Sequence, residues 1–68
     1  MEGIKISVII PVYNGAKTIV RAMASVSHQT YHNVELIVVN DGSKDNTDEV
    51  VRDFLKSIEI PFDYVVIE

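Results

Sequence analysis

The stretch that decides the fold is VELIVVNDGS, residues 34–43. Its first six residues, 34–39, are rich in β-branched side chains, and four turn-forming residues, 40–43, follow directly. Apolar side chains stand at successive positions over residues 36–39, as they do in a strand that is buried on both faces of a sheet. We therefore expect a strand over residues 34–39, inside a parallel sheet, with a loop at its carboxyl end.

Two further strands are predicted on either side of this stretch. Residues 4–10, IKISVII, begin as strict alternation and end as continuous apolar residues before Pro11. Proline cannot donate to a sheet ladder, so we expect the first strand to end there. A third strand is predicted over residues 62–67, FDYVVI, which follow the turn signal at residues 60–61.

Amphipathic helices are predicted between these strands, over residues 16–27 and 47–57. In both, apolar residues recur at the spacing that places them on one face of a helix. The apolar faces are Ile19, Met23 and Val26 in the first helix and Val50, Phe54 and Ile58 in the second. The polar faces opposite them are Lys17, Arg21 and Ser25, and Asp48, Arg52 and Lys56. Asn46 lies three residues before Glu49, a spacing that predicts a reciprocal cap at the start of the second helix.

The order βαβαβ predicts an α/β fold with a parallel sheet, and right-handed crossovers place both helices on the same face of it. The opposite face is then uncovered, although the strand patterns are typical of burial on both sides. We therefore expect residues 1–68 to be a truncated domain, half of a Rossmann-like doubly wound sheet. Self-association through the uncovered face is a further expectation.

Composition restricts the class of protein. A chain of 68 residues with 47% hydrophobic and 24% charged residues is long enough for one globular domain and no more. The absence of cysteine excludes disulfides, thiolate metal sites and a catalytic thiol. A net charge of -4 without a basic run argues against a nucleic-acid partner. The longest apolar run is residues 36–39, and no signal-peptide pattern precedes it, so a cytoplasmic location is the default expectation.

Ligands of open parallel sheets bind outside the carboxyl ends of the strands, here residues 11–15 and 40–43. These residues contain neither the glycine-rich dinucleotide motif nor a P-loop motif, which argues against both kinds of phosphate cradle. They do offer the ring of Tyr13, which can stack on a base, and the carboxylate of Asp41, which can accept hydrogen bonds from a base or a ribose. The two loops therefore predict a nucleoside site.

Three blocks of sequence in this order and spacing are jointly specific. SVIIPVYNG at residues 7–15, QTY at 29–31, and ELIVVNDGS at 35–43, with Asp45 and Thr47 after it, resemble the N-terminal part of family-2 glycosyltransferases of the GT-A fold. The resemblance covers nearly the whole chain. It implies an enzyme that transfers a sugar from a nucleotide-sugar donor, most often a uridine diphosphate sugar, to an acceptor hydroxyl that the sequence does not identify.

The resemblance also implies which residues bind the nucleotide. In that family the segment matching residues 11–13 and the carboxylate matching Asp41 hold the base and the ribose. The candidate set is Pro11, Val12, Tyr13, Asn14, Asp41, Gly42 and Ser43. Asn40 replaces the first acidic residue of the family's usual D-D-G-S, whereas Asp41 keeps the second. Structural roles in the loops and at the helix starts are the competing interpretation for Asn14, Ser43, Asp45, Asn46 and Thr47.

The groups for the chemical step are expected outside these residues. The family's D-x-D, which binds Mg or Mn with the diphosphate, does not occur here, and no catalytic Asp base can be assigned. We therefore predict no catalytic residue, no metal ligand and no cofactor within residues 1–68. His28 and His32 flank a loop at the opposite, N-terminal end of the strand at residues 34–39, where no catalytic role is expected, and Gln29 is expected to be structural. The longer protein is expected in the cytoplasm or on the cytoplasmic face of a membrane.

Two other classes of function stay open at this point. A nucleotide-binding Rossmann-like domain of another enzyme also places an acid after its second strand, although it usually carries the glycines that are missing here. A binding module without catalysis would have the same loops. A D-x-D some tens of residues further along the reading frame would favour the transferase.

Overall fold

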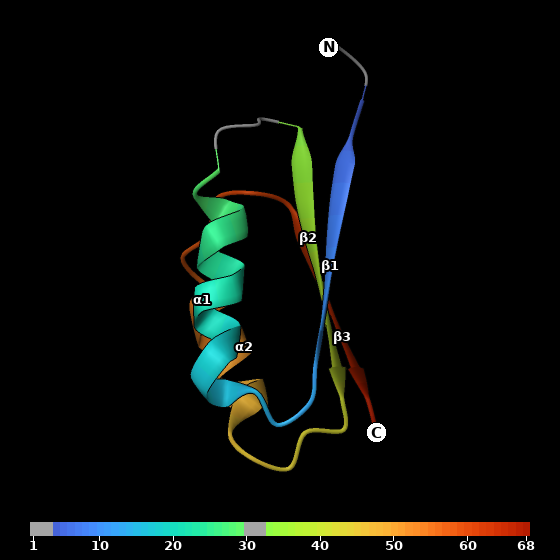
Figure 1. Ribbon diagram of the computed structural model, residues 1–68, viewed down its shortest axis with the longest axis vertical. Helices are drawn as coiled ribbons and strands as arrows, with labels where there is room; N and C mark the ends of the chain where they lie inside the picture. Colours follow the sequence, from blue (N-terminus) through green and yellow to red (C-terminus); the bar gives the residue numbers. More distant parts are fainter. Residues whose placement is uncertain (1–3, 30–32) are drawn as a thin grey trace.

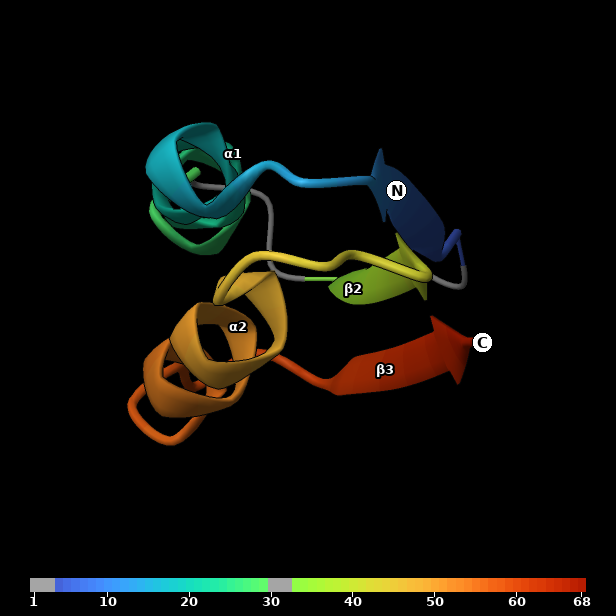
Figure 2. The same cartoon turned by 90° about the horizontal axis from the view of Figure 1, so that it is seen from below.

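The computed structural model describes residues 4–29 and 33–68. The elements follow the predicted order: β1 (Ile6–Val12), α1 (Ala16–Ser27), β2 (Val34–Asp41), α2 (Thr47–Leu55) and β3 (Phe62–Ile67). The strands form one parallel sheet in the order β1-β2-β3 (Figure 1). Both helices lie on the same side of this sheet, which confirms the predicted arrangement (Figure 2).

β1 extends through Pro11, so the prediction that the strand ends there was wrong. The reason is the direction of the backbone N–H groups. Ile6 donates to Asn33 at 2.9 Å, so the N–H groups at alternate positions of β1 face β2. Pro11 lies at an odd step from Ile6, and its missing N–H therefore faces the free edge of β1, where proline costs no ladder bond.

β2 is two residues longer than predicted because its last residues are paired with the neighbouring strands. Asn40 is the register partner of Val12 in β1 and of Val66 in β3, and Asp41 is the partner of Ile67. The turn-forming residues at positions 40 and 41 therefore close the strand, and the loop begins at Gly42. Pairing across the sheet overrides the local turn preference of Asn and Asp.

The helices differ in how well their buried faces were predicted. α1 has the predicted bounds and buries Ile19 and Met23 as expected. α2 ends at Leu55, and its fully buried row is Thr47, Val51 and Leu55. The predicted row, Val50, Phe54 and Ile58, is only half-buried and packs against the edge of the core. α2 contacts both the sheet and α1, so its apolar surface is wider than a single row. The fully buried row begins with a polar residue, Thr47, and was therefore not recognised as apolar in the sequence.

The cap of α2 also differs from the prediction. Asn46 makes no side-chain cap hydrogen bond, so the predicted reciprocal cap with Glu49 was wrong. Asp45 serves instead: its Oδ1 accepts the backbone N–H of Thr47 at 3.0 Å. This carboxylate, one residue before Asn46, satisfies the free N–H of the first residue of the helix and complements the positive end of the helix.

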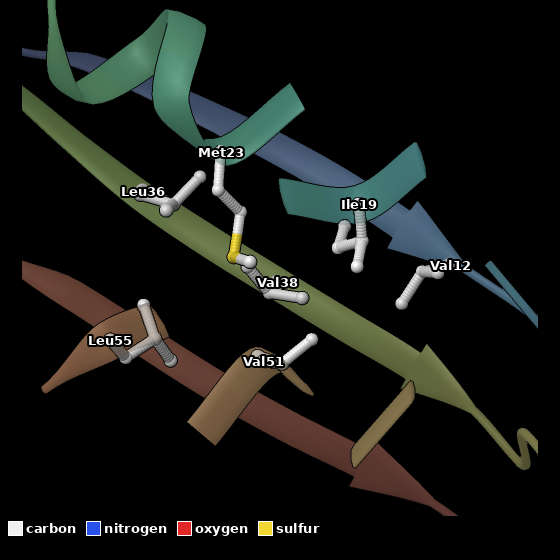
Figure 3. Packing of buried hydrophobic residues seen from close by; sticks show 7 residues of the cluster. All are labelled: Val12, Ile19, Met23, Leu36, Val38, Val51 and Leu55. Atoms are coloured by element: carbon white, nitrogen blue, oxygen red, sulfur yellow. The ribbon is translucent and has the colours of Figure 1, made fainter. Parts of the chain in front are cut away.

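The hydrophobic core lies between the helices and β2 (Figure 3). Met23, Leu36, Val38 and Val51 are all completely buried there. Each such side chain contributes about 1.5–3 kcal/mol relative to the exposed state. The buried positions of β2 alternate, so the helices cover one face of the central strand and leave the other half-exposed.

We call the uncovered side of the sheet the open face. By strand register its apolar residues are Ile9, Pro11, Ile37, Val39, Val65 and Ile67. Ile9 is 61% exposed and Ile67 is 49% exposed. Among the described residues, no helix lies on this side of the sheet (Figure 2). Within the same residues, neither helix is long and apolar enough to cross a membrane.

Candidate functional site

The loops after β1 and β2 lie together at the carboxyl end of the sheet, at the lower end of Figure 1. Asn14 joins them through both its backbone and its side chain. Its N–H donates to Ser43 Oγ at 2.8 Å, and its Oδ1 accepts the N–H of Lys44 at 2.7 Å. Asn14 adopts a left-handed backbone conformation with φ of 50°, which asparagine tolerates better than most residues. The two loops are therefore one hydrogen-bonded unit.

Asp45 and Thr47 connect the starts of the two helices. The Oδ2 of Asp45 accepts the N–H of Ala16 at 3.4 Å, while its Oδ1 accepts the N–H and the hydroxyl of Thr47. The hydroxyl oxygen of Thr47 in turn accepts the N–H of Gly15 at 3.1 Å. The bond from the Thr47 hydroxyl holds the pKa of Asp45 below its ordinary value, and backbone N–H groups act in the same direction. The structural roles predicted for Asp45 and Thr47 are confirmed.

Removing the hydroxyl of Thr47 tests this connection. Thr47 is completely buried, so Thr47→Val leaves the N–H of Gly15 without its partner at nearly constant volume. We expect a loss of about 1–3 kcal/mol in the free energy of unfolding, measured by urea denaturation of the full-length protein. Thr47→Ser keeps the hydroxyl and is the matched control. A larger loss for serine than for valine would show that packing of the methyl group, and not the hydrogen bonds, holds this position.

The predicted site residues differ in where their side chains lie: Val12 and Pro11 belong to the body of the sheet, whereas Tyr13 and Asp41 are exposed at its carboxyl end. Val12 is buried in the core with its side chain against Gly15, and Pro11 lies on the open face. Tyr13 is 58% exposed, and Asp41 is exposed at the end of β2. Val12 and Asn40 are register partners in adjacent strands. Tyr13 and Asp41, the residues that follow them, therefore lie next to each other at the carboxyl end of the sheet.

Gly42 and Ser43 line a hollow of about 320 Å³ between the β2–α2 loop and the end of β3. The other lining residues are Asn40, Lys44, Asp48, Val66, Ile67 and Glu68. Gly42 has a φ of 68°, a left-handed conformation that favours glycine at this turn. The structure therefore gives the Gly42–Ser43 turn a fixed shape beside open space.

Sequence reasoning missed the polar group beneath the hollow. Asn40 is 1% exposed, and its amide donates to the Tyr64 hydroxyl at 2.9 Å. Tyr64 donates to Asp48 Oδ1 at 2.7 Å. Asn40 stands at a core position of β2, two residues after Val38, and that alternation is the signal that could have indicated its burial.

Other predicted residues lie away from the loops. His28 is the C-cap residue of α1, at the end of that helix opposite the loop pair, and its N–H donates to Ala24. His32, and two residues of the QTY block, lie outside the described residues. Among residues 4–29 and 33–68, no three His, Asp or Glu side chains form a group that could hold a metal ion.

Comparison with known proteins gives the family. The family model described as Glycosyl transferase family 2 matches residues 7–68. An uncharacterised glycosyltransferase of Rickettsia typhi is 53% identical over 49 residues, which are 72% of this chain and 15% of that protein. The glycosyltransferase GlyG of Streptococcus pneumoniae is 44% identical over 50 residues, 74% of this chain and 17% of the relative.

A third relative is a chondroitin synthase of Escherichia coli, 40% identical over 58 residues. The match covers 84% of this chain and 8% of the synthase. This chain thus spans less than a fifth of each of these relatives. Because the family model covers nearly all of the chain and the parallel βαβαβ sheet carries its motifs in adjacent loops, the chain belongs to glycosyl transferase family 2.

Proposed function

We propose that these residues form the nucleotide-binding part of a longer glycosyltransferase. The enzyme transfers a sugar from a nucleotide-sugar donor, a uridine diphosphate sugar, to an acceptor hydroxyl. The short share of each relative that the chain covers supports a longer protein, and the relatives' names support the reaction class. The observation that carries the proposal is the exposed carboxylate of Asp41 beside the exposed ring of Tyr13, on two loops that hydrogen bonds join.

Each candidate residue has a specific part in binding. The ring of Tyr13 stacks on the base, and Asp41 accepts hydrogen bonds from the base or the ribose hydroxyls. Asn14 and Ser43 hold the two loops together through the bond at 2.8 Å. Because the loops are already fixed, the nucleotide binds without a large cost for ordering them.

We infer that the chemical step uses groups that lie outside residues 1–68. The acidic residues of the described part do not fit a metal site, since Asp45 and Asp48 are engaged as a helix cap and as an acceptor for Tyr64. We therefore assign to the rest of the longer protein both the Mg²⁺ or Mn²⁺ ion for the leaving diphosphate and the base for the acceptor hydroxyl. Residues 1–68 contribute the binding of the nucleoside.

The proposal predicts that the isolated 68-residue chain transfers no sugar. Positioning the nucleoside alone leaves both the leaving group and the acceptor hydroxyl unassisted. The test is release of uridine diphosphate from several uridine diphosphate sugars, with Mg²⁺ and Mn²⁺ supplied. The full-length protein in the same assay is the positive control. Turnover by the isolated chain above a protein-free control would contradict the assignment of roles, and an inactive full-length protein would contradict the reaction.

A further inference from the structure

A chain of three side chains runs under the loop that carries Asp41. The Oδ1 of Asn40 accepts the N–H of Ser43 at 3.1 Å, and its Nδ2 donates to the hydroxyl oxygen of Tyr64 at 2.9 Å. The Tyr64 hydroxyl donates to Asp48 Oδ1 at 2.7 Å. We call Asn40, Tyr64 and Asp48 the relay. It joins β2, β3 and α2, and through Ser43 it reaches Asn14 in the other loop.

The direction of these bonds is fixed by the number of protons. Tyr64 has one hydroxyl proton, and it donates this proton in a hydrogen bond to the carboxylate of Asp48. The oxygen of Tyr64 must then accept from its other neighbour, and at position 40 an amide or a protonated acid can donate to it, whereas an ionised carboxylate cannot. An ionised carboxylate at position 40 would compete with Asp48 for the one hydroxyl proton of Tyr64, and one of the two carboxylates would then face the Tyr64 oxygen as acceptor against acceptor.

The charges around Asn40 keep Asp48 ionised, and Asp48 therefore stays the acceptor for Tyr64. From α2 it faces Asp48 and Arg52, which form an exposed ion pair at 3.0 Å. The hydrogen bond from Tyr64, and then Arg52, hold the pKa of Asp48 below its ordinary value.

The other elements around Asn40 add few charges. β3 presents Tyr64, whose pKa is raised mainly by burial. β1 presents the apolar Val12, its register partner, and α1 presents apolar core residues. Lys44 and Glu68 line the hollow next to it, and Asp41 points to the other side of the sheet.

We propose that Asn40 is a positioning residue for the nucleotide site and that this role requires the amide. Tyr64 and Asp48 hold the amide in its orientation, and its Oδ1, which accepts the N–H of Ser43, fixes the turn that presents Asp41, Gly42 and Ser43. Asn40 stands in place of the first acidic residue of the D-D-G-S motif, and in this chain its amide supplies the donor that the Tyr64–Asp48 pair needs. The effect on the nucleotide rests on the proposed function, whereas the effect on the turn does not.

The experiment exchanges the amide and the carboxylate at the two ends of the relay in the full-length protein, so that its hydrogen bonds run in the opposite direction. Asn40→Asp at neutral pH is expected to weaken uridine diphosphate binding about tenfold, which corresponds to one lost buried hydrogen bond. Burial and the charge of Asp48 raise the pKa of the introduced carboxyl group, so binding should recover at mildly acidic pH as that group takes up a proton and donates to Tyr64.

Asp48→Asn is the matched partner variant. Alone it should cost less than about threefold, because its amide oxygen still accepts from Tyr64 and only an exposed ion pair is lost. Combined with Asn40→Asp, it should restore binding at neutral pH to within about threefold of wild type. The new amide at position 48 donates to Tyr64, and Tyr64 donates to the new carboxylate at position 40.

Two results would overturn the relay: a double variant as weak as Asn40→Asp alone, or a defect of Asn40→Asp that does not change with pH. If the wild-type protein binds no uridine diphosphate, the proposed function fails, and the urea midpoints decide on the relay. Asn40→Asp should then lower the midpoint at neutral pH, less so at mildly acidic pH, and the double variant should recover it. Midpoints that follow neither pattern would exclude a role for the amide.

Discussion

Replacing Asp41 with alanine in the full-length protein should weaken the binding of uridine diphosphate by about one to two orders of magnitude, because hydrogen bonds to a charged group contribute about 1.5–3 kcal/mol. Binding of cytidine diphosphate should change little or improve. The ionised carboxylate only accepts hydrogen bonds, so it can pair with the N3–H of uracil, whereas cytosine presents an unprotonated nitrogen at that position. Asp41 is exposed at the end of β2, where it can make this contact.

Calorimetric titration of both nucleotides into wild type and Asp41→Ala measures this selectivity. Asp53→Ala, an exposed carboxylate on α2, is the control for a change in net charge. Asp41→Asn should retain part of the affinity, since an amide oxygen can still accept the same hydrogen bond. Equal losses of the two nucleotides in Asp41→Ala would mean that Asp41 shapes the loop and does not read the base.

The isolated 68-residue chain should associate and unfold without a cooperative transition, because the open face stays exposed to water. The six apolar residues of the open face form one contiguous patch, in which Ile9, Val65 and Ile67 are 61%, 44% and 49% exposed. Contiguous exposed apolar patches tend to associate, and a chain this short has little core to offset the exposure. Light scattering should show a mass that rises with concentration, and a dye for exposed apolar surface should bind.

Charged substitutions on the open face separate this cause from general instability. Ile9→Lys together with Val65→Lys should lower both the associated mass and the dye signal, since both residues lie on the open face. Val20→Lys, at an exposed apolar position of α1, is the matched control and should change neither. A monomeric mass at high concentration with a cooperative thermal transition and no dye binding would show that the open face does not drive association.

Most of the fold could be predicted because each element carries its own local pattern. The β-branched run at residues 34–39 and the spacing of Ile19 and Met23 specify one strand and one helix without reference to the rest of the chain. The errors occur where a neighbouring element decides. Pro11 is tolerated because of its place at an edge, and the buried row of α2 includes Thr47 because both α1 and the sheet pack against that helix.

The candidate site was predictable to the level of loops but not of contacts. The rule that ligands bind at the carboxyl ends of parallel strands was enough to select Tyr13 and Asp41. The bonds of Asn14 with Ser43 and of Asn40 with Tyr64 join residues that lie 29 and 24 positions apart. No spacing pattern in a single sequence encodes such pairs, because they depend on how the crossovers bring the loops together.

Pro11 also has a consequence for how the sheet can grow. Along the outer edge of β1 the backbone donors belong to Ser7 and Ile9, and the next position in that series is the proline. A strand that adds to this edge can form a complete ladder beside the first half of β1 and meets a missing donor beside the second half. In a Rossmann-like doubly wound sheet the second half continues from the first strand, so a strand added to this edge would pair fully with the first half of β1 and would lack one ladder bond at Pro11, next to the loop that follows β1.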